Sequence, residues 1–125
     1  TDLRPGEILW PVHAPTPDPA LRHCHFKVGR RNALAIAVVS LAATWSCQPD
    51  GPLQDIHLAW GSVGPTVMVF PEIEKTLLGK PLTVESLKSV AALVQERVMP
   101  IDDVRASARY RRLVSGNLLL KLLEA

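Results

Sequence analysis

The centre of the chain reads ALAIAVVSLAATWSC at residues 33–47, QPDGP at 48–52 and LQDIHLAWGSV at 53–63. The first run is apolar and rich in β-branched side chains, which fits a strand buried on both faces. A helix is the competing interpretation, and the turn signal that follows decides against it. Beyond this turn Ile56, Leu58 and Trp60 alternate with residues that face the other way. The pattern predicts two long strands joined as an antiparallel hairpin.

Shorter extended segments flank the hairpin. Gly64-Pro65 turns the chain, and TVMVF at residues 66–70 predicts a third, short strand. Upstream, GEILWPVH at residues 6–13 has the apolar character of a short strand, and its proline places that strand at a sheet edge. APTPDP at residues 14–19 contains three prolines and predicts an extended connector.

The second half of the chain has a helical period. A first helix of about two turns is expected from Pro71 to a glycine C-cap at Gly79. A second is expected from the Thr83 cap until Pro100. A third is expected from Asp102-Asp103, whose carboxylates suit a helix N-terminus, to Leu122. Strands followed by helices predict an α+β fold: a three-stranded antiparallel meander with about three helices packed on one face.

Composition sets broad limits on function. The 125 residues are the length of one ordinary domain, and 47% hydrophobic with 21% charged residues is typical of a folded globular chain. A formal charge of +2 is too small to predict nucleic acid or an anionic membrane as a partner. The longest apolar run, at residues 33–43, is about half the length that a membrane span requires.

Several features point to a cytoplasmic piece of a longer polypeptide. Cys24 and Cys47 are expected to be free thiols rather than a disulfide, because nothing upstream of them resembles a secretory leader. The chain also begins with Thr1 instead of Met, which reads like the interior of a longer chain or a processed product.

Candidate chemical sites are weak when read from the residues alone. His23-Cys24-His25 contains zinc-ligand residue types, but no spacing supports a closed tetrahedral site, so no metal is expected. No Ser-His-Asp arrangement is visible, and Asp102-Asp103 is interpreted as a helix cap rather than an acid–base pair, so no catalytic residue is assigned.

Two clusters of cations remain open to more than one interpretation. Arg105, Arg109 and Arg112 are expected to share a helix face, either as a phosphate-contacting stripe or as a solvated surface partly neutralised by nearby acids. KVGRR at residues 27–31 precedes the first long strand, where it could hold a pyrophosphate or an anionic flavin, or be a solvated strand end. It lacks the spaced glycines of a dinucleotide-binding loop.

Four segments, in this order, resemble the C-terminal domain of the flavin subunit of molybdenum hydroxylases, the family of carbon monoxide dehydrogenase and xanthine dehydrogenase. They are LRPGEIL at residues 3–9, FKVGRRNALAIA at 26–37, IHLAWGSVGPT at 56–66 and PIDDVRASARYRR at 100–112. The last segment is the most specific, because generic amphipathic helices rarely combine this turn, cap, arginines and tyrosine.

The resemblance implies a place in an electron-transfer chain. Electrons leave a substrate at a molybdenum–pterin centre, cross 2Fe–2S clusters in partner subunits or domains, and reach FAD, which reduces NAD or another acceptor. Residues 1–20 would then be a leading strand and connector from a preceding FAD-binding domain, and residues 21–125 the C-terminal domain. Because the preceding domains bind most of the flavin, this chain alone is not expected to retain FAD.

The resemblance also implies two flavin-contacting residues. Leu9 matches an apolar residue near the isoalloxazine ring, and Lys27 matches a lysine that reaches the flavin environment. In some eukaryotic relatives the loop after this lysine is acidic and governs access of the nicotinamide acceptor, whereas here it begins Arg30-Arg31, so the acceptor stays open. Trp10 and Pro11 are unusual for the family's leading segment.

Two other classes of function compete with this interpretation. One is an independent protein-interaction module that binds a partner along an exposed sheet edge. The other is a nucleic-acid binder that uses the arginines between Arg105 and Arg112, and the modest net charge argues against it.

Overall fold

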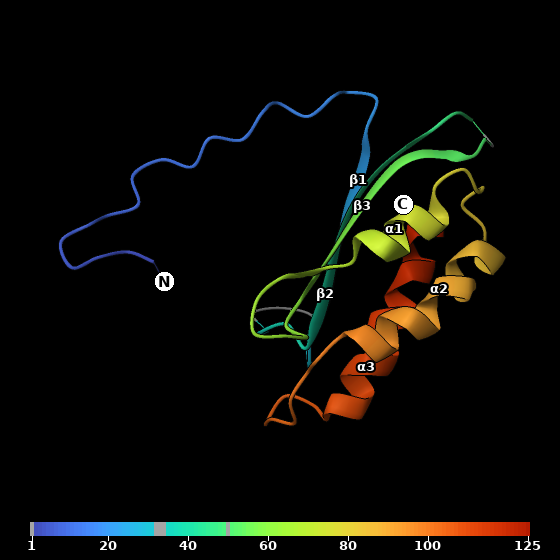
Figure 1. The fold of residues 1–125 in the computed structure, drawn as a ribbon. Coiled ribbons are helices and arrows are strands. Elements are labelled where there is room, and N and C mark those ends of the chain that lie inside the picture. The colour runs from blue at the N-terminus through green and yellow to red at the C-terminus, as the bar shows by residue number, and fades with distance from the viewer. Residues whose placement is uncertain (1, 32–34, 50) are drawn as a thin grey trace.

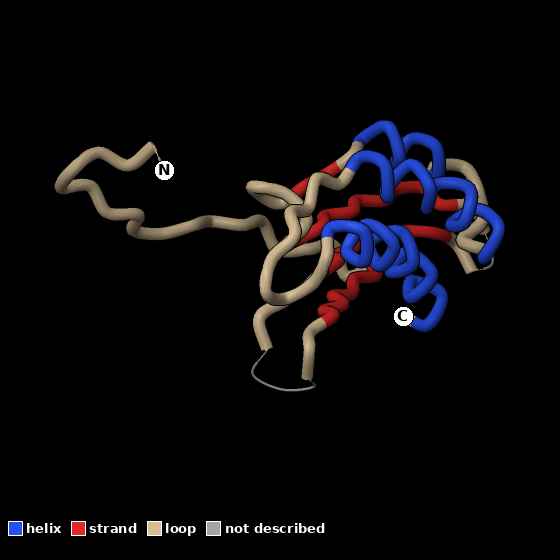
Figure 2. Tube along the Cα trace, turned by 90° about the horizontal axis from the view of Figure 1, so that it is seen from below, coloured by secondary structure: helices blue, strands red, loops and turns tan. Residues whose placement is uncertain are grey.

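The computed structural model describes residues 2–31, 35–49 and 51–125 and confirms the α+β class. In chain order its elements are β1 (Arg22–Val28), β2 (Val39–Cys47), β3 (Leu53–Gly61), β4 (Met68–Val69), α1 (Pro71–Leu77), α2 (Val84–Arg97), α3 (Ala108–Asn117) and the 3-10 helix η1 (Leu118–Glu124). The strands form an antiparallel meander in the order β1-β2-β3-β4. The helices pack on one face of this sheet, as Figures 1 and 2 show from two directions.

The central hairpin is confirmed, but β2 is shorter than expected and is buried on one face only. Residues 35–38 lie outside the strand, and residues 32–34 of the expected strand fall outside the described residues. Within β2, Leu41 and Trp45 are buried against the helices whereas Ala42 between them is exposed. The expectation of burial on both faces is therefore wrong, because the helices form a single layer and leave the other face open.

The described part of the sheet has four strands, one more than expected. The additional strand, β1, pairs with β2 from Arg22↔Trp45 to Val28↔Val39. Its sequence, RHCHFKV, alternates polar and apolar residues, but its histidines and cysteine obscure that period. The expected strand at residues 66–70 is present only as the two residues of β4.

The helices follow their predicted caps, with one correction. Gly79 has a φ of 76° just beyond α1, as a glycine C-cap requires. The Thr83 side chain accepts from the Ser86 backbone N–H, and the Ser86 hydroxyl accepts from the Thr83 N–H, which closes a capping box on α2. The third helix starts at Ala108 behind an N-cap at Ser107 rather than at Asp102, because the residues before it fold into an ion-paired loop.

The core lies between the sheet and the helices. Its large, fully buried side chains include Trp45, Ile56, Leu58, Trp60, Ile73, Leu77, Leu87, Leu119 and Leu122. The buried Trp60 indole donates to the Ser115 carbonyl at 3.1 Å, which ties β3 to α3. Burial of these side chains is the main stabilising contribution to the layer.

The N-terminal segment lies outside this core. Residues 7–17 have no regular secondary structure, and Ile8, Leu9 and Trp10 are 76%, 70% and 85% exposed. The segment extends away from the sheet in Figures 1 and 2. The strand expected over residues 6–13 is thus not formed, since none of the described strands pairs with this segment.

Candidate functional site

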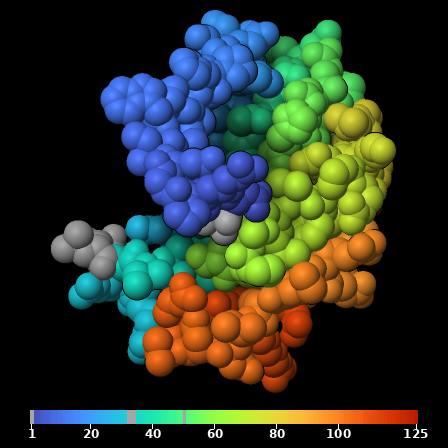
Figure 3. Space-filling model, turned by 60° about the vertical axis from the view of Figure 1, so that its left-hand side comes forward, coloured from blue at the N-terminus to red at the C-terminus, as the bar shows by residue number. Residues whose placement is uncertain are grey.

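Three connections meet at the end of the sheet where β1 and β3 finish, here called the loop end. They are the β1–β2 connection, described at residues 29–31 and 35–38, the β3–β4 connection at 62–67, and the α2–α3 connection at 98–107. Figure 3 shows atoms of the α2–α3 connection, in orange, beside those of the β1–β2 connection, in cyan. The loop end therefore brings together the segments that contain Lys27-to-Arg31 and Pro100-to-Arg112.

Asp103 organises the loop end. Its carboxylate accepts from the Arg105 guanidinium at 2.6 and 2.8 Å, from the Arg105 backbone N–H at 2.8 Å, and from the Arg111 guanidinium. Hydrogen bonds first from Arg105 and then from Arg111 hold the pKa of the Asp103 carboxyl well below its usual range. These three residues, called the Asp103 cluster below, are charged under ordinary conditions.

The Asp103 cluster connects to the core and to the β3–β4 connection through Arg111. This arginine is only 2% exposed, and it donates to the Ser62 carbonyl at 3.3 Å. A buried charge is tolerated only when it is paired and hydrogen-bonded, and here Asp103 supplies the pairing. The Asp102–Asp103 pair is thus only partly a cap, because Asp102 accepts from the Ala108 N–H at 2.6 Å while Asp103 pairs with arginines.

Two further arginine contacts link the β1–β2 and α2–α3 connections reciprocally. Arg30 donates from its side chain to the Val104 carbonyl at 3.0 Å. In the opposite direction, Arg105 donates to the Ala37 carbonyl at 3.4 Å. Each connection therefore binds the backbone of the other.

Lys27 lies at the loop end on the open face of the sheet. The side chains next to it in β1, Phe26 and Val28, pack against the core, so Lys27 points the other way. Its ammonium donates to the Ala35 carbonyl at 3.3 Å. In register beside it are Ser40 of β2 and then Gly61 of β3. A Cβ at Gly61 would lie 2.5 Å from the Ser40 hydroxyl, so the glycine leaves room for the Ser40 side chain in this row.

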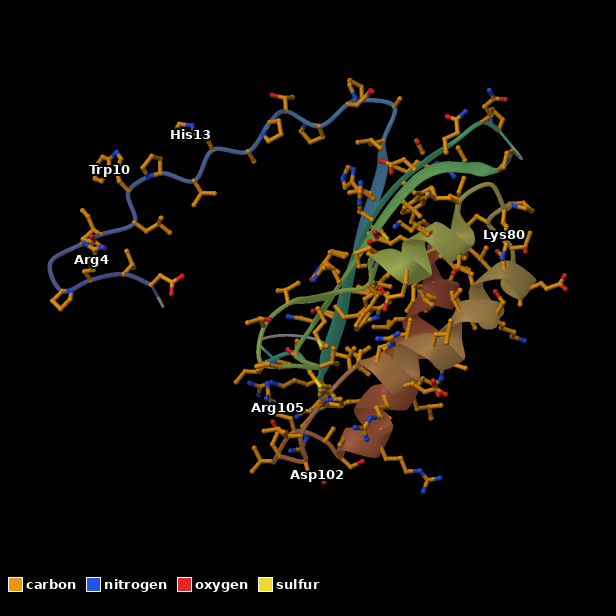
Figure 4. The ribbon with its side chains drawn as sticks, in the orientation of Figure 1. Arg4, Trp10, His13, Lys80, Asp102 and Arg105 are labelled. Carbon is orange, nitrogen blue, oxygen red and sulfur yellow. The ribbon has the colours of Figure 1, made fainter. Side chains whose placement is uncertain are left out.

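Leu9, the other residue assigned from the resemblance, is not brought near Lys27. It sits on the exposed N-terminal segment, which joins β1 at the end opposite to the loop end. In Figure 4 the labelled Trp10 and His13 lie on this outstretched segment, far from Arg105 and Asp102. Any site that combines Leu9 and Lys27 therefore needs the segment to take another position or a neighbour to lie between them.

The middle of the open face carries a shallow groove of about 560 Å³. His57 lines it, with Nε2 at 3.4 Å from an Asp55 carboxylate oxygen and Nδ1 at 3.9 Å from one of Glu74. His23 and His25 share this face, as their spacing predicts for a strand. Among the described residues no group of three or more His, Cys, Asp or Glu is placed to hold a metal ion.

Both cysteines are free thiols, as expected. Burial raises the pKa of the Cys24 thiol, partly offset by a hydrogen bond with the backbone of Ala43. The thiol form is therefore favoured, which does not suit a nucleophile.

The expected arginine stripe is not formed. Arg105 precedes α3 and is bound by Asp103, and Arg111 is buried, so Arg109 and Arg112 are the two exposed members. These two line a broad groove between α2 and α3 together with Glu96, Tyr110 and Leu113. A groove with a carboxylate and apolar walls lacks the continuous positive surface that a phosphate backbone requires.

The fold and the loop end together define a class of protein: a one-sided α+β layer whose connections are joined by arginine contacts at one end of the sheet. The comparisons give the family. Residues 24–125 match the family model described as the CO dehydrogenase flavoprotein C-terminal domain, and the chain belongs to this family.

Individual relatives agree with this family assignment. The chain is 33% identical over 97% of its length to the glyceraldehyde dehydrogenase medium chain of Sulfolobus acidocaldarius, covering 42% of it. It is 32% identical over 87% of its length to the xanthine dehydrogenase FAD-binding subunit of Escherichia coli O157:H7, covering 37% of it. The chain thus spans about two-fifths of the length of these relatives.

Solved structures share the fold. Carbon monoxide dehydrogenase from Hydrogenophaga pseudoflava, in a form lacking the Mo-pyranopterin moiety, superposes with a TM-score of 0.80 at 24% identity, over 89% of this chain and 38% of that one. Quinoline 2-oxidoreductase from Pseudomonas putida 86 gives a TM-score of 0.73 at 27% identity, over 87% and 38% of the two chains. In the described residues no helix is long and apolar enough to cross a membrane.

Proposed function

We propose that this chain completes the FAD-binding subunit of a molybdenum hydroxylase and performs no catalysis alone. Membership of the flavoprotein C-terminal domain family carries this proposal, and the names of the relatives, a medium chain and an FAD-binding subunit, support it. Bound FAD would accept electrons from iron–sulfur clusters and pass them to an acceptor. The chain would supply packing, charge and limited solvent access around the flavin.

Two observations at the loop end support contact with the edge of a flavin rather than with the whole cofactor. The small residues Ser40 and Gly61 lie in register beside Lys27, where they would leave room for a planar ring, and the ammonium would favour an anionic reduced form. The sequence has no spaced-glycine loop of the dinucleotide or P-loop type for the phosphates. Lys27 would thus contact FAD held mainly by the preceding part of the subunit, and the isolated chain would not retain it.

Residues 1–20 belong, in this proposal, with the preceding FAD-binding domain, and residues 21–125 form the C-terminal domain. Ile8, Leu9, Trp10 and Val12 are all at least 70% exposed, and residues 7–17 form no strand in this structure. Pairing with a sheet of the preceding domain would cover these side chains and would place Leu9 beside the flavin ring. Their exposure in this chain supports a missing neighbour.

The partners of the whole subunit follow from the same proposal. They are the upstream FAD-binding domains and the iron–sulfur and molybdopterin subunits, in a cytoplasmic enzyme. The two free thiols are consistent with a reducing compartment. In this proposal the substrate of the molybdenum centre is selected in another subunit or domain, and the electron acceptor stays open.

The test is expression of this chain together with its contiguous upstream region. The expected product is yellow, with the visible spectrum of a bound flavin, whereas the isolated residues 1–125 give a folded, colourless protein. A well-folded, colourless product from the longer polypeptide would overturn the proposal. That result would favour the alternative of a protein-interaction module, for which β1 offers the available sheet edge.

A further inference from the structure

We infer that Arg30 and Arg105 act as positioning residues, which clamp the β1–β2 connection to the α2–α3 connection and thereby hold Lys27 at a fixed place. This inference rests on the proposed function for its link to the flavin. The clamp itself, which is the attachment of one connection to the other, is argued from hydrogen bonds within this chain.

Two hydrogen bonds join the same two connections in opposite directions. The Arg30 side chain reaches the Val104 carbonyl, and the Arg105 side chain reaches the Ala37 carbonyl, so both strand-proximal limbs of the β1–β2 connection are tied to one loop. Two bonds that run in opposite directions restrain both separation and sliding of the loops. A single contact would allow rotation about it.

The α2–α3 connection is itself held in place by ion pairs. Arg105 is held at the Asp103 carboxylate by both its guanidinium and its backbone N–H. Asp103 also pairs with the buried Arg111, which binds the Ser62 carbonyl. The loop is thus anchored in the core by charge-assisted bonds, and it offers a firm support for the β1–β2 connection.

Lys27 is bonded to the same limb of the β1–β2 connection that Arg105 contacts. The Lys27 ammonium donates to Ala35, two residues before the Ala37 carbonyl that Arg105 holds. The base of the connection is closed by the Val38 N–H, which donates to Val28 at 2.7 Å. Movement of residues 35–38 would therefore move the group that orients the lysine.

The clamp serves position rather than folding. Arg30 is exposed and Arg105 is partly exposed, and neither is among the buried side chains of the core. Loss of the single Arg30 hydrogen bond has a small effect on global stability but a direct effect on local opening, whereas loss of the Arg105 side chain also removes its ion pair with Asp103. A positioning role and a purely structural role can thus be separated by experiment.

The experiment uses the contiguous flavin subunit with three variants: Arg30→Met, Arg105→Met, and the control Arg109→Met. Arg109 is an exposed arginine of α3 with no hydrogen bond to the β1–β2 connection among the described residues. The measurements are hydrogen exchange at residues 28–31 and 35–38, the flavin circular dichroism, and the thermal midpoint. The methionine stem retains much of the apolar contact and removes the donors.

The expected result is exchange roughly five- to tenfold faster at these amides in both clamp variants. The flavin circular dichroism should change with it. The thermal midpoint of Arg30→Met should stay close to that of Arg109→Met, whereas Arg105→Met also loses the ion pair with Asp103 and should have a lower midpoint. Unchanged exchange and an unchanged flavin signal would overturn the inference. Faster exchange with an unchanged flavin signal would overturn its link to Lys27 and the flavin. A wild-type subunit without flavin would instead refute the proposed function, and the exchange data would still decide whether the clamp exists.

Discussion

At the scale of single residues, the acidity of the Asp103 carboxyl depends on its two arginine partners. Its pKa is depressed by the two arginines, so its stabilising contribution is present above the unfolded-state pKa of about 3.9 and is lost as the pH falls through the lower folded-state value. Asp103→Asn should therefore lower the thermal midpoint at about pH 7, and the difference from wild type should shrink below about pH 4.

Thermal unfolding as a function of pH checks this. The matched control is Asp102→Asn, which keeps an acceptor for the Ala108 N–H and removes a carboxylate without a salt bridge in the described residues. It should shift the midpoint at neutral pH less than Asp103→Asn does. An Asp103→Asn difference that stayed constant from neutral to acid pH would show that the ion pairs do not stabilise the fold.

A second prediction at this scale concerns the effect of Lys27 on the midpoint potential of the flavin. An ammonium beside the ring stabilises negative charge on the reduced flavin, so Lys27→Met in the contiguous subunit should lower the midpoint potential, on the order of tens of millivolts. Redox titration followed by the visible spectrum measures the shift. Lys80→Met, at the opposite end of the sheet in Figure 4, is the control. Equal potentials in the two variants would remove Lys27 from the flavin environment.

The residues of the site were only partly predictable from sequence. The pattern at residues 100–112 is specific to the family, but it predicts a cap for each carboxylate. Asp103 and Arg111 are eight residues apart and meet because the chain from Asp103 to Ser107 forms a loop instead of the first turn of α3. A helical reading separates them, and an aspartate flanked by several arginines was the available signal of an ion-paired loop.

At the scale of elements, strong local signals predicted the structure well. Turn, cap and periodicity placed the hairpin, α1 and α2, because each of these rests on contacts close in sequence. The local pattern does not predict β1, and it makes β2 too long, because strand ends depend on the pairing between Arg22–Val28 and Val39–Cys47, which lies outside any local window. The single-sided burial of β2 likewise depends on how many layers the whole chain forms.

The close packing of α3 against α2 at Gly116 leads to a prediction at this scale. A Cβ at Gly116 would lie 2.7 Å from both the Ala91 carbonyl oxygen and the Gln95 side-chain amide. Alanine favours helix over glycine by about 1 kcal/mol, but the close approach to the α2 backbone outweighs it. Gly116→Ala should therefore destabilise the fold, by about 1–3 kcal/mol.

Urea unfolding of the isolated chain gives the measurement. Asn117→Ala, at the exposed neighbouring position of α3, receives the propensity gain without the clash and should be neutral or slightly stabilising. If Gly116→Ala proved as stable as Asn117→Ala, α2 and α3 would be farther apart than the structure has them.

At the scale of the whole molecule, the chain is a folded layer with an uncovered N-terminal segment. Limited proteolysis of the isolated chain should cut first within residues 2–21, because these residues are outside the core and lack strand pairing. In the contiguous subunit the same segment should resist cleavage, since the preceding domain would cover Ile8, Leu9 and Trp10. Equal cleavage in both proteins would contradict the assignment of residues 1–20 to the preceding domain.

The open sheet face and the exposed N-terminal segment support the proposal that this chain is one domain of a larger flavin-binding subunit. Its family could be recognised from four segments of sequence, because they include the residues that build the loop end. The substrate and the acceptor could not be predicted: the proposed substrate pocket belongs to another subunit, and the Arg30-Arg31 loop does not by itself identify an acceptor. The central claim is therefore that this chain contributes to the binding and environment of FAD.

The most direct test is the FAD dissociation constant of the contiguous subunit compared with that of the same polypeptide ending before Thr1. Flavin fluorescence measures both, and adding residues 1–125 in trans controls for misfolding of the shortened protein. We predict weaker FAD binding without this chain and at least partial recovery, with a changed flavin spectrum, when it is added back. Equal affinity and equal spectra with and without the chain would contradict the account.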